Sequence, residues 1–413
     1  MIRLNRTLVL ALIITIFLVG FTQNSQDRNP RFVSQISKIS TKSYSNDIKY
    51  QPSKNAWDYF HPTWVKSTPW TLIAVNNPTE KSIETSQAGV LIEDPRNRIE
   101  KEFIPTDDIK GRVQFWIDIY SRFSSRTRVI HDRRRPDIIF GYIDFRPLYR
   151  SLPSAAAADE RARGFEKKIL KELRIRLDEA AGLTKTKLLS LDEKSAIQAF
   201  LSRSGALDRT SYEKFIRNIR TQTGQSDVFL VALQRSRLLL PHIESVFKQQ
   251  GLPVALARIP FVESSFNPKA LSKIGAVGIW QFTRETAREL IHSDAEHLWS
   301  DPLRQTKSAA RLLRLYRAAL PDWGTAVTAY NSGVGRVRRI AEKYKVRKIG
   351  TLIDLARNDT LGFAGKNFYA EFLAANFVEA YKEELFGSLL TGTDSKLVFK
   401  DREGAVPKEL CDL

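Results

Sequence analysis

The stretch that decides the fold runs from residue 253 to residue 283 and reads PVALARIPFVESSFNPKALSKIGAVGIWQFT. Pro253 suits the first turn of a helix, and the apolar residues behind it recur at the spacing of one helical face. Pro268 disfavours a helical conformation for the residue before it, so this helix should end at the ESS tripeptide. Small residues predict a loop over 272–278, and a second helix should begin near Thr283.

Glu263 stands at the predicted end of that first helix, in a setting made apolar by Phe261, Val262 and Phe266. An apolar setting disfavours the charged carboxylate and raises its pKa, which is what a general acid needs at neutral pH. The negative end of the helix dipole also repels a carboxylate there. The residues alone leave two interpretations open, a functional acid and a surface carboxylate near a helix end.

The residues that follow also predict helices. Asp301 and Pro302 suit the N-cap and the first turn of one helix, and another should end at the AYN tripeptide before SGVG. A long helix is predicted over roughly 367–384. No strand pattern appears between about 245 and 385, so this region should be nearly all-α.

Upstream, the pattern predicts a helical region that contains one small β-hairpin. Arg128–Ile130 and Ile138–Phe145 alternate as strands do, with Arg133–Pro136 as their turn. Apolar residues at helical spacing predict further helices. These segments are 115–120, 165–177, 191–200, 212–219 and 228–240.

The composition excludes several classes of protein. The chain has 413 residues, of which 42% are hydrophobic and 27% charged, a globular balance. Its one cysteine, Cys411, rules out an internal disulfide framework and a cysteine-based metal site, and the five histidines form no H-E-x-x-H pair. No G-x-S-x-G, P-loop or G-x-G-x-x-G motif is present. We therefore expect no metal and no cofactor.

The charge and the N-terminus indicate where the protein works. The formal net charge of +19 favours anionic partners. Arg3 and Arg6 precede an apolar run from Leu8 to Phe21, which is the layout of a secretory signal. The run is short for a spanning helix and lacks a clear cleavage site, so a cleaved signal and an inner-membrane anchor both stay open. Either version predicts a periplasmic or cell-envelope location and argues against a nucleic-acid partner.

Several motifs in succession resemble one known family. Glu263-Ser264 is followed by GAVGIWQF at 275–282 and by AYNSG at 329–333. This order resembles the soluble lytic transglycosylase (SLT) family, and in particular its membrane-bound murein transglycosylase D-like branch. The resemblance implies a mainly α protein with a lysozyme-like catalytic domain, of the goose-type lysozyme and SLT kind, that binds the glycan strands of peptidoglycan.

The resemblance also implies roles for single residues. Glu263 matches the family's catalytic acid. Five residues match its substrate-binding positions: Ser264, Ser272, Gln281, Tyr330 and Asn331. Trp280 replaces the usual methionine before the glutamine, and its apolar neighbours predict a core position. The family often has a tyrosine on its last helix near the acid, where this chain has Phe368 with Tyr369 beside it.

The implied activity is that of a lytic transglycosylase, which cleaves the β-1,4 bond between N-acetylmuramic acid and N-acetylglucosamine and leaves 1,6-anhydromuramic ends. The next acidic residue along the chain after Glu263 is Glu285, beyond the glycine-rich loop, so we expect one carboxyl group to serve as acid and then as base. Two alternatives stay open: a goose-type-lysozyme-like hydrolase on the same fold, and a catalytically silent peptidoglycan-binding protein. The intact Glu263 favours an enzyme.

The predicted organisation has five parts. Residues 1–25 form the signal or anchor, 26–104 a partly disordered linker, 105–245 a helical pre-domain with the hairpin, 246–385 the lysozyme-like SLT catalytic domain, and 386–413 a C-terminal tail. One hypothesis for the pre-domain is an arm that extends the glycan-binding surface.

Overall fold

The computed structural model describes residues 71–73, 87–185, 189, 191–203, 208–291, 301–356 and 361–390. The predicted signal or anchor over 1–25 lies outside these residues, as does most of the predicted tail over 386–413. Among the described residues, no helix is both long enough and apolar enough to cross a membrane.

The described chain is mainly helical, which confirms the predicted fold class. Its N-terminal part consists of β1 (Thr71–Ile73), α4 (Gln87–Leu91), η3 (Lys101–Phe103), α5 (Asp107–Ser121), β2 (Thr127–Asp132), β3 (Ile139–Asp144), α6 (Arg146–Ser151), α7 (Ala155–Ala180), α8 (Leu191–Arg203), α9 (Arg209–Arg217) and β4 (Ile219–Thr223). The rest consists of α10 (Ser226–Gln249), η4 (Val254–Arg258), α11 (Ile259–Ser264), α12 (Arg284–Ile291), α13 (Pro302–Ala319), α14 (Trp323–Ser332), α15 (Val334–Tyr344), α16 (Ile349–Leu355), α17 (Gly362–Ala380), α18 (Lys382–Phe386) and η6 (Gly387–Leu390).

The β2–β3 hairpin is confirmed, but the sheet that contains it has four antiparallel strands in the order β1-β3-β2-β4. The two outer strands were not predicted: β1 lies in the predicted linker, and β4 begins at Ile219, where a helix was expected to end. The β4 sequence IRTQT shows no apolar alternation, and most of its residues are half-buried. β4 therefore pairs with β2 because of tertiary contacts, which the local sequence pattern does not reveal.

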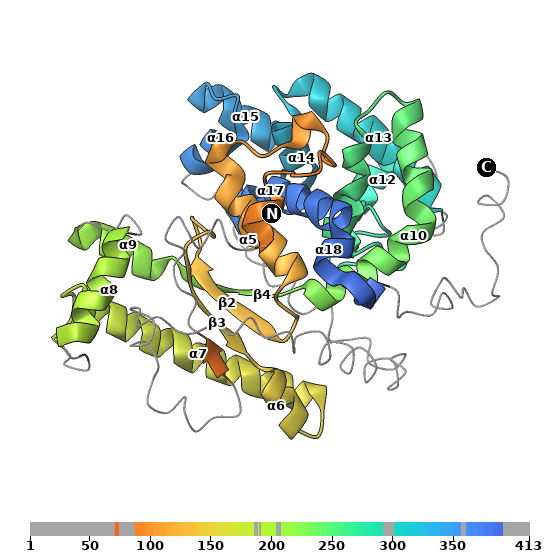
Figure 1. Cartoon of the computed structure of the whole chain (residues 1–413). Helices are drawn as coiled ribbons and strands as arrows, with labels where there is room; N and C mark the ends of the chain where they lie inside the picture. Colours follow the sequence, from red (N-terminus) through yellow and green to blue (C-terminus); the bar gives the residue numbers. More distant parts are fainter. Residues whose placement is uncertain are drawn as a thin grey trace, which may run out of the picture.

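The sheet separates two hydrophobic cores. Val129 on β2 belongs to the main core, and the next residue, Ile130, belongs to a second core. Successive side chains of a strand point to opposite faces, so each face of the sheet covers one core. The second core contains residues of α7, α8 and α9, and Figure 1 shows α7 running along one side of the sheet with α5 on the other.

The main core extends across the predicted boundary between 105–245 and 246–385. Its buried residues run from Ala88 on α4 to Leu390 on η6, and α10 continues through the boundary without a break. Both α4 and η3, which lie in the predicted linker, contribute to this core through residues such as Leu91 and Phe103. The division into domains stays a prediction, and the packing is continuous from α4 to η6 within the described residues.

Several of the predicted helices differ from the structure in their bounds. The helix expected from Pro253 is a 3-10 segment, η4, followed by α11, because Pro260 lacks an amide hydrogen and suits the first turn of a new helix. The helix expected over 367–384 begins earlier, at Gly362, and ends at Ala380. The cap at Asp301 is confirmed, since its carboxylate accepts from two backbone N–H groups of α13.

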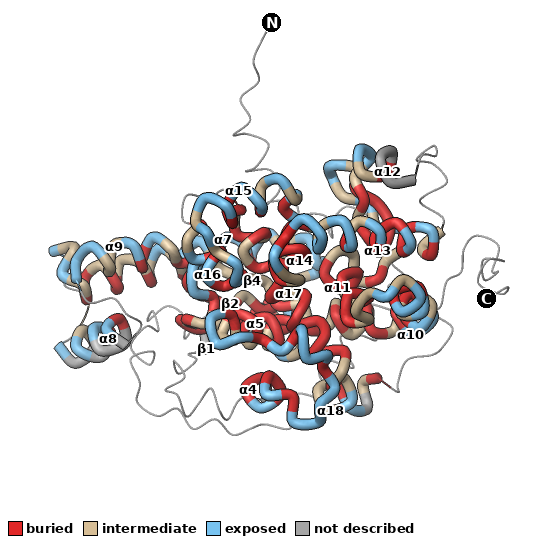
Figure 2. The backbone as a smooth tube through the Cα atoms, turned by 90° about the horizontal axis from the view of Figure 1, so that it is seen from above, coloured by how far each residue is buried: buried red, intermediate tan, exposed pale blue. Residues whose placement is uncertain are grey.

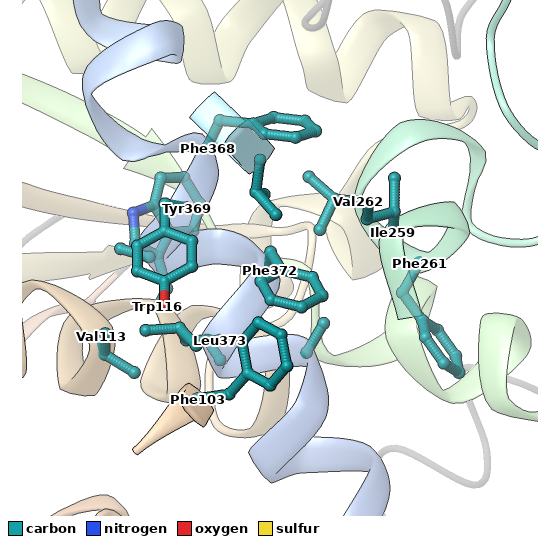
Figure 3. Packing of buried hydrophobic residues seen from close by; sticks show 14 of the residues in the cluster. Phe103, Val113, Trp116, Ile259, Phe261, Val262, Phe368, Tyr369, Phe372 and Leu373 are labelled. Atoms are coloured by element: carbon teal, nitrogen blue, oxygen red, sulfur yellow. The ribbon is translucent and has the colours of Figure 1, made fainter. Parts of the chain in front are cut away.

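Helix α17 runs through the middle of the main body (Figure 2). Its residues Phe368, Phe372 and Leu373 lie among side chains of α5, η3 and α11 (Figure 3). Polar contacts also join α17 to α5. At one of them Asn367, which is fully buried, accepts hydrogen bonds from Trp116 Nε1 at 3.1 Å and from Arg112 Nη1 at 3.0 Å. This amide oxygen therefore connects the N-terminal part to the last long helix.

Asn367→Leu should lower the free energy of unfolding by about 3 kcal/mol, because a buried indole N–H and a buried guanidinium both lose their acceptor. Urea unfolding followed by tryptophan fluorescence measures the loss. Asn376→Leu is the matched control, since Asn376 is also buried on α17 but donates to Phe372 within its own helix. That control should cost about 1 kcal/mol. Equal losses in the two variants would contradict a special role for the bridge to α5.

Candidate active site

The chain reverses sharply just after Glu263. Ser265 and Phe266 both have left-handed backbone conformations, with φ of 52° and 54°, which non-glycine residues rarely adopt. Such residues persist only where their surroundings hold them. Phe266 is fully buried with its ring 4.5 Å from that of Phe261, and the Ser265 carbonyl accepts from Arg235 Nη1 at 3.3 Å. The turn thus fixes the end of α11, where Glu263 sits.

Glu263 is half-buried, and its carboxyl group is held in its neutral form at neutral pH. Burial raises the pKa of Glu263 to about 8, and the nearby Glu371 carboxylate adds to the rise. Burial raises the pKa values of the Tyr120 and Tyr330 hydroxyl groups, and the negative charge of Glu263 adds to the rise for both. Glu371 on α17, Tyr120 on α5 and Tyr330 on α14 therefore interact electrostatically with Glu263 on α11.

Glu371 is a functional candidate that the sequence reasoning missed. It is half-buried on α17, accepts a hydrogen bond from the Tyr120 hydroxyl at 3.3 Å, and has a pKa that burial raises to about 8. Glu263 is therefore not a lone carboxyl group, although the next acidic residue along the chain, Glu285, is exposed on α12. A signal was available: Glu371 is the one charged residue in the apolar stretch 367–378.

Tyr330 is held in place by contacts with residues of the hydrophobic core. Its hydroxyl donates to the Trp280 carbonyl at 2.8 Å, and its ring stacks on Phe368 with an interplanar angle of 9°. Trp280 is fully buried and donates from Nε1 to Thr306 Oγ1 at 2.9 Å, which confirms its predicted core position. Asn331, the neighbour of Tyr330, is exposed at the end of α14.

The other predicted substrate-binding residues organise the loop between α11 and α12. Ser264 Oγ donates to the Ile279 carbonyl at 2.9 Å, and Ser272 Oγ accepts from the Ala276 amide at 2.8 Å. Gln281 Nε2 donates to the Gly278 carbonyl at 2.9 Å. All three side chains are half-buried, so each stabilises the loop and still has an accessible surface.

Tyr369 does not face Glu263. Its ring packs on that of Phe372, with centroids 6.0 Å apart. It also lies so close to Gly324 of α14 that a larger residue there would be crowded by the Tyr369 ring. Burial and the charges of Asp322 and Glu102 raise its pKa, so it lies on the side of α17 that faces η3 and the start of α14. Figure 3 shows Phe368 and Tyr369 pointing in different directions from the helix.

The site is therefore a half-buried pair of carboxyl groups with two phenols beside it, in a helical surround. A carboxylic acid that keeps its proton at neutral pH can protonate a leaving oxygen, and its conjugate base can then accept a proton. Within the described residues, no group of three His, Cys, Asp or Glu side chains is arranged to hold a metal ion.

Comparisons with known proteins match the same region. The family model described as Transglycosylase SLT domain matches residues 243–353. Membrane-bound lytic murein transglycosylase D of Escherichia coli (strain K12) is 32% identical over 145 residues, which is 34% of this chain and 30% of that protein. Membrane-bound lytic murein transglycosylase F of Alcanivorax borkumensis is 32% identical over 111 residues, 24% of this chain and 23% of that protein.

A third relative is the putative tributyltin chloride resistance protein of Alteromonas sp. (strain M-1), 32% identical over 114 residues, 27% of this chain and 55% of that protein. The chain thus spans under two thirds of the length of each of these relatives. Glu263 and all five predicted substrate-binding residues fall inside the matched range, whereas Tyr120 and Glu371 fall outside it. Residues 243–353 therefore match the transglycosylase SLT domain, the lysozyme-like domain that the motifs predict.

Proposed function

We propose that this protein is a peptidoglycan lytic transglycosylase whose acid is Glu263. The observation that carries the proposal is the half-buried carboxyl group, with a pKa raised to about 8, at the end of α11 inside an SLT domain. The SLT match and the names of the relatives support the substrate class. A general acid with a pKa near the working pH combines the right protonation state with a strong driving force for proton transfer.

In the proposed reaction, Glu263 protonates the oxygen that leaves C1 of N-acetylmuramic acid. The N-acetyl group of the same sugar stabilises the cationic centre. The Glu263 carboxylate then takes the proton from the C6 hydroxyl as that oxygen closes on C1, so one carboxyl group serves first as acid and then as base. The reaction consumes no water, and the new glycan end is a 1,6-anhydro sugar.

The proposed substrate contacts come from the loop and from the end of α14. They are Ser264, Ser272, Gln281, Tyr330 and Asn331. The exposure of Asn331 and the half-exposed hydroxyl and amide groups of the loop support sugar contacts there. The exposed basic residues Arg338, Arg339 and Lys343 of α15 support attraction of anionic envelope polymers. The alternative interpretation is that these residues form an ordinary solvated helix face.

The proposed location is the periplasmic side of the cell envelope. The basic residues before the apolar run at 8–21 support export, with the segment either cleaved as a signal or kept as an inner-membrane anchor. Two of the relatives carry "membrane-bound" in their names, which supports a place near a membrane. The proposed partners are peptidoglycan glycan strands.

One observation favours a second candidate, a goose-type-lysozyme-like hydrolase. Hydrolytic glycosidases generally use two carboxyl groups, and Glu371 acts on Glu263 electrostatically. In that reaction, water attacks C1 and the product has a reducing end. The two candidates share the acid and differ in the nucleophile.

Glu263→Gln should lower the rate of sacculus solubilisation by about 10²–10⁴-fold, because the amide keeps the size of the side chain but has no proton to give. Turbidity of purified sacculi at pH 7 measures the rate. Glu285→Gln is the control, since it removes an exposed carboxylate at the start of α12. Equal rates for wild type and Glu263→Gln would contradict the assignment, and a wild type that binds sacculi without dissolving them would favour the silent binding protein.

The ends of the released fragments should be 1,6-anhydromuramic sugars, because the sugar's own C6 hydroxyl is the proposed nucleophile. Mass spectrometry distinguishes them from hydrolysed ends, which are heavier by one water. Chemical reduction with borohydride gives an independent check, since it labels hydrolysed ends and leaves anhydro ends unchanged. Reducing ends as the main product would replace the transglycosylase by the hydrolase.

A further inference from the structure

Helix α13 carries positive charge and no negative charge. Its 18 residues contain no acidic residue, and the basic ones are all exposed: Arg304, Lys307, Arg311, Arg314 and Arg317. The other described helices of at least 15 residues, α5, α7, α10 and α17, each contain acidic residues. A solvated helix face ordinarily mixes both signs of charge. The charge of α13 is therefore unusual among the long helices that the structure describes.

Four of these side chains share one face of the helix. They recur at intervals of three, four and three residues, which is the spacing of neighbours on a helix surface. We call them the α13 basic face: Arg304, Lys307, Arg311 and Arg314. The opposite side of the helix packs into the protein, where Thr306, Ala309 and Leu313 are fully buried. The basic face is therefore the outward face of α13.

Neighbouring carboxylates do not neutralise the α13 basic face. Asp301 Oδ2 lies 4.0 Å from Arg304 Nε, and the other oxygen of Asp301 accepts from two backbone N–H groups at the start of α13. Within the described residues, Lys307, Arg311 and Arg314 form no ion pair. The positive charge of the face is therefore available to an external anion.

Exposed apolar residues continue the same face toward the end of the helix. Leu315 lies one turn after Arg311 and is 53% exposed. Ala318, Ala319 and Pro321, which follow it, are exposed as well. A leucine gains little from contact with a hydrophilic polyanion, but it can enter the boundary between the head groups and acyl chains of a lipid bilayer. The combination of basic side chains with Leu315 therefore fits a membrane surface better than a polymer.

The α13 basic face lies on the side of its helix away from the catalytic loop. Thr306, on the buried side, accepts a hydrogen bond from Trp280 Nε1 at 2.9 Å. The residue before Trp280, Ile279, accepts through its carbonyl from Ser264, the neighbour of Glu263. The loop that holds the proposed glycan contacts therefore packs on the inner side of α13. A partner on the outer side leaves those contacts free.

We propose that the α13 basic face binds the surface of a membrane that contains anionic phospholipids. The guanidinium and ammonium groups contact head-group phosphates, and Leu315 enters the interfacial layer. Each basic residue near an anionic lipid surface strengthens such binding, and salt weakens it. This surface goes beyond the proposed function, because it takes no part in catalysis and is the same for both candidate reactions. It is also separate from the apolar run at 8–21.

Sedimentation of the full chain with lipid vesicles tests the inference. One set of vesicles is an equimolar mixture of phosphatidylglycerol and phosphatidylcholine. The other is phosphatidylcholine alone, which measures any binding through the apolar run at 8–21. The chain should prefer the phosphatidylglycerol vesicles, and the preference should fall as salt is added. Replacing Arg304, Lys307 and Arg311 together by Gln should reduce the preference roughly 100-fold. Arg314 is kept because it donates to the Gln250 carbonyl.

A triple variant on α7 is the matched control, in which Arg163, Lys167 and Lys171 are replaced by Gln. These residues are also exposed on a long helix, and the net charge changes by the same amount. The control should keep the wild-type preference for phosphatidylglycerol. Equal losses in the two triple variants would show that net charge alone attracts the chain, and no loss in the α13 variant would place the binding elsewhere. Either result would overturn the inference.

Leu315→Ala separates a membrane from a polyanion as the partner. It should weaken binding to phosphatidylglycerol vesicles roughly fivefold, because apolar area no longer leaves water. Binding of long-chain polyphosphate should stay unchanged. Unchanged vesicle binding in Leu315→Ala would mean that the face recognises charge alone, and the membrane assignment would be wrong. These assays contain no peptidoglycan, so their outcome is independent of whether the proposed reaction is correct.

Discussion

The packing of α17 against α5 and α11 is the constraint on which the rest of the structure depends. Asn367 joins α17 to α5 through two buried hydrogen bonds, and the Phe368, Phe372 and Leu373 side chains fill the space between the helices. Because α17 is held from both sides, Glu371 is brought up to Glu263 without a flexible linkage. The low dielectric of this packed surround is also what keeps both carboxyl groups largely protonated.

Local signals predicted most of the long helices and singled out Glu263 as a candidate acid. Asp301 marks a helix start, the AYN tripeptide marks a helix end, and Glu263 stands out by its apolar neighbours. Pro253, in contrast, precedes a 3-10 segment and not the α-helix expected there. The hydrogen bond between Tyr120 and Glu371 was beyond such signals, because the two residues are 251 positions apart in the chain. Only the tertiary fold brings them together, as it brings the polar strand β4 to the edge of the sheet.

The N-terminal part contacts the helix that carries Glu371. The Tyr120 hydroxyl on α5 donates a hydrogen bond to Glu371 on α17. The layer of α7, α8 and α9 packs on the other face of the sheet (Figure 1), and α8 and α9 lie at the opposite end of the molecule from α10 and α13 (Figures 1 and 2). An arm that extends the glycan-binding surface stays a hypothesis for that layer.

The proposed reaction requires that Glu263 keep its proton at neutral pH. Carbon-13 NMR of the full chain labelled at glutamate side-chain carboxyl carbons measures this directly, with the Glu263 signal assigned by its loss in Glu263→Gln. We expect a Glu263 midpoint near 8, well above the ordinary glutamate value. A midpoint between about 4 and 5, as for a solvent-exposed glutamate, would contradict it.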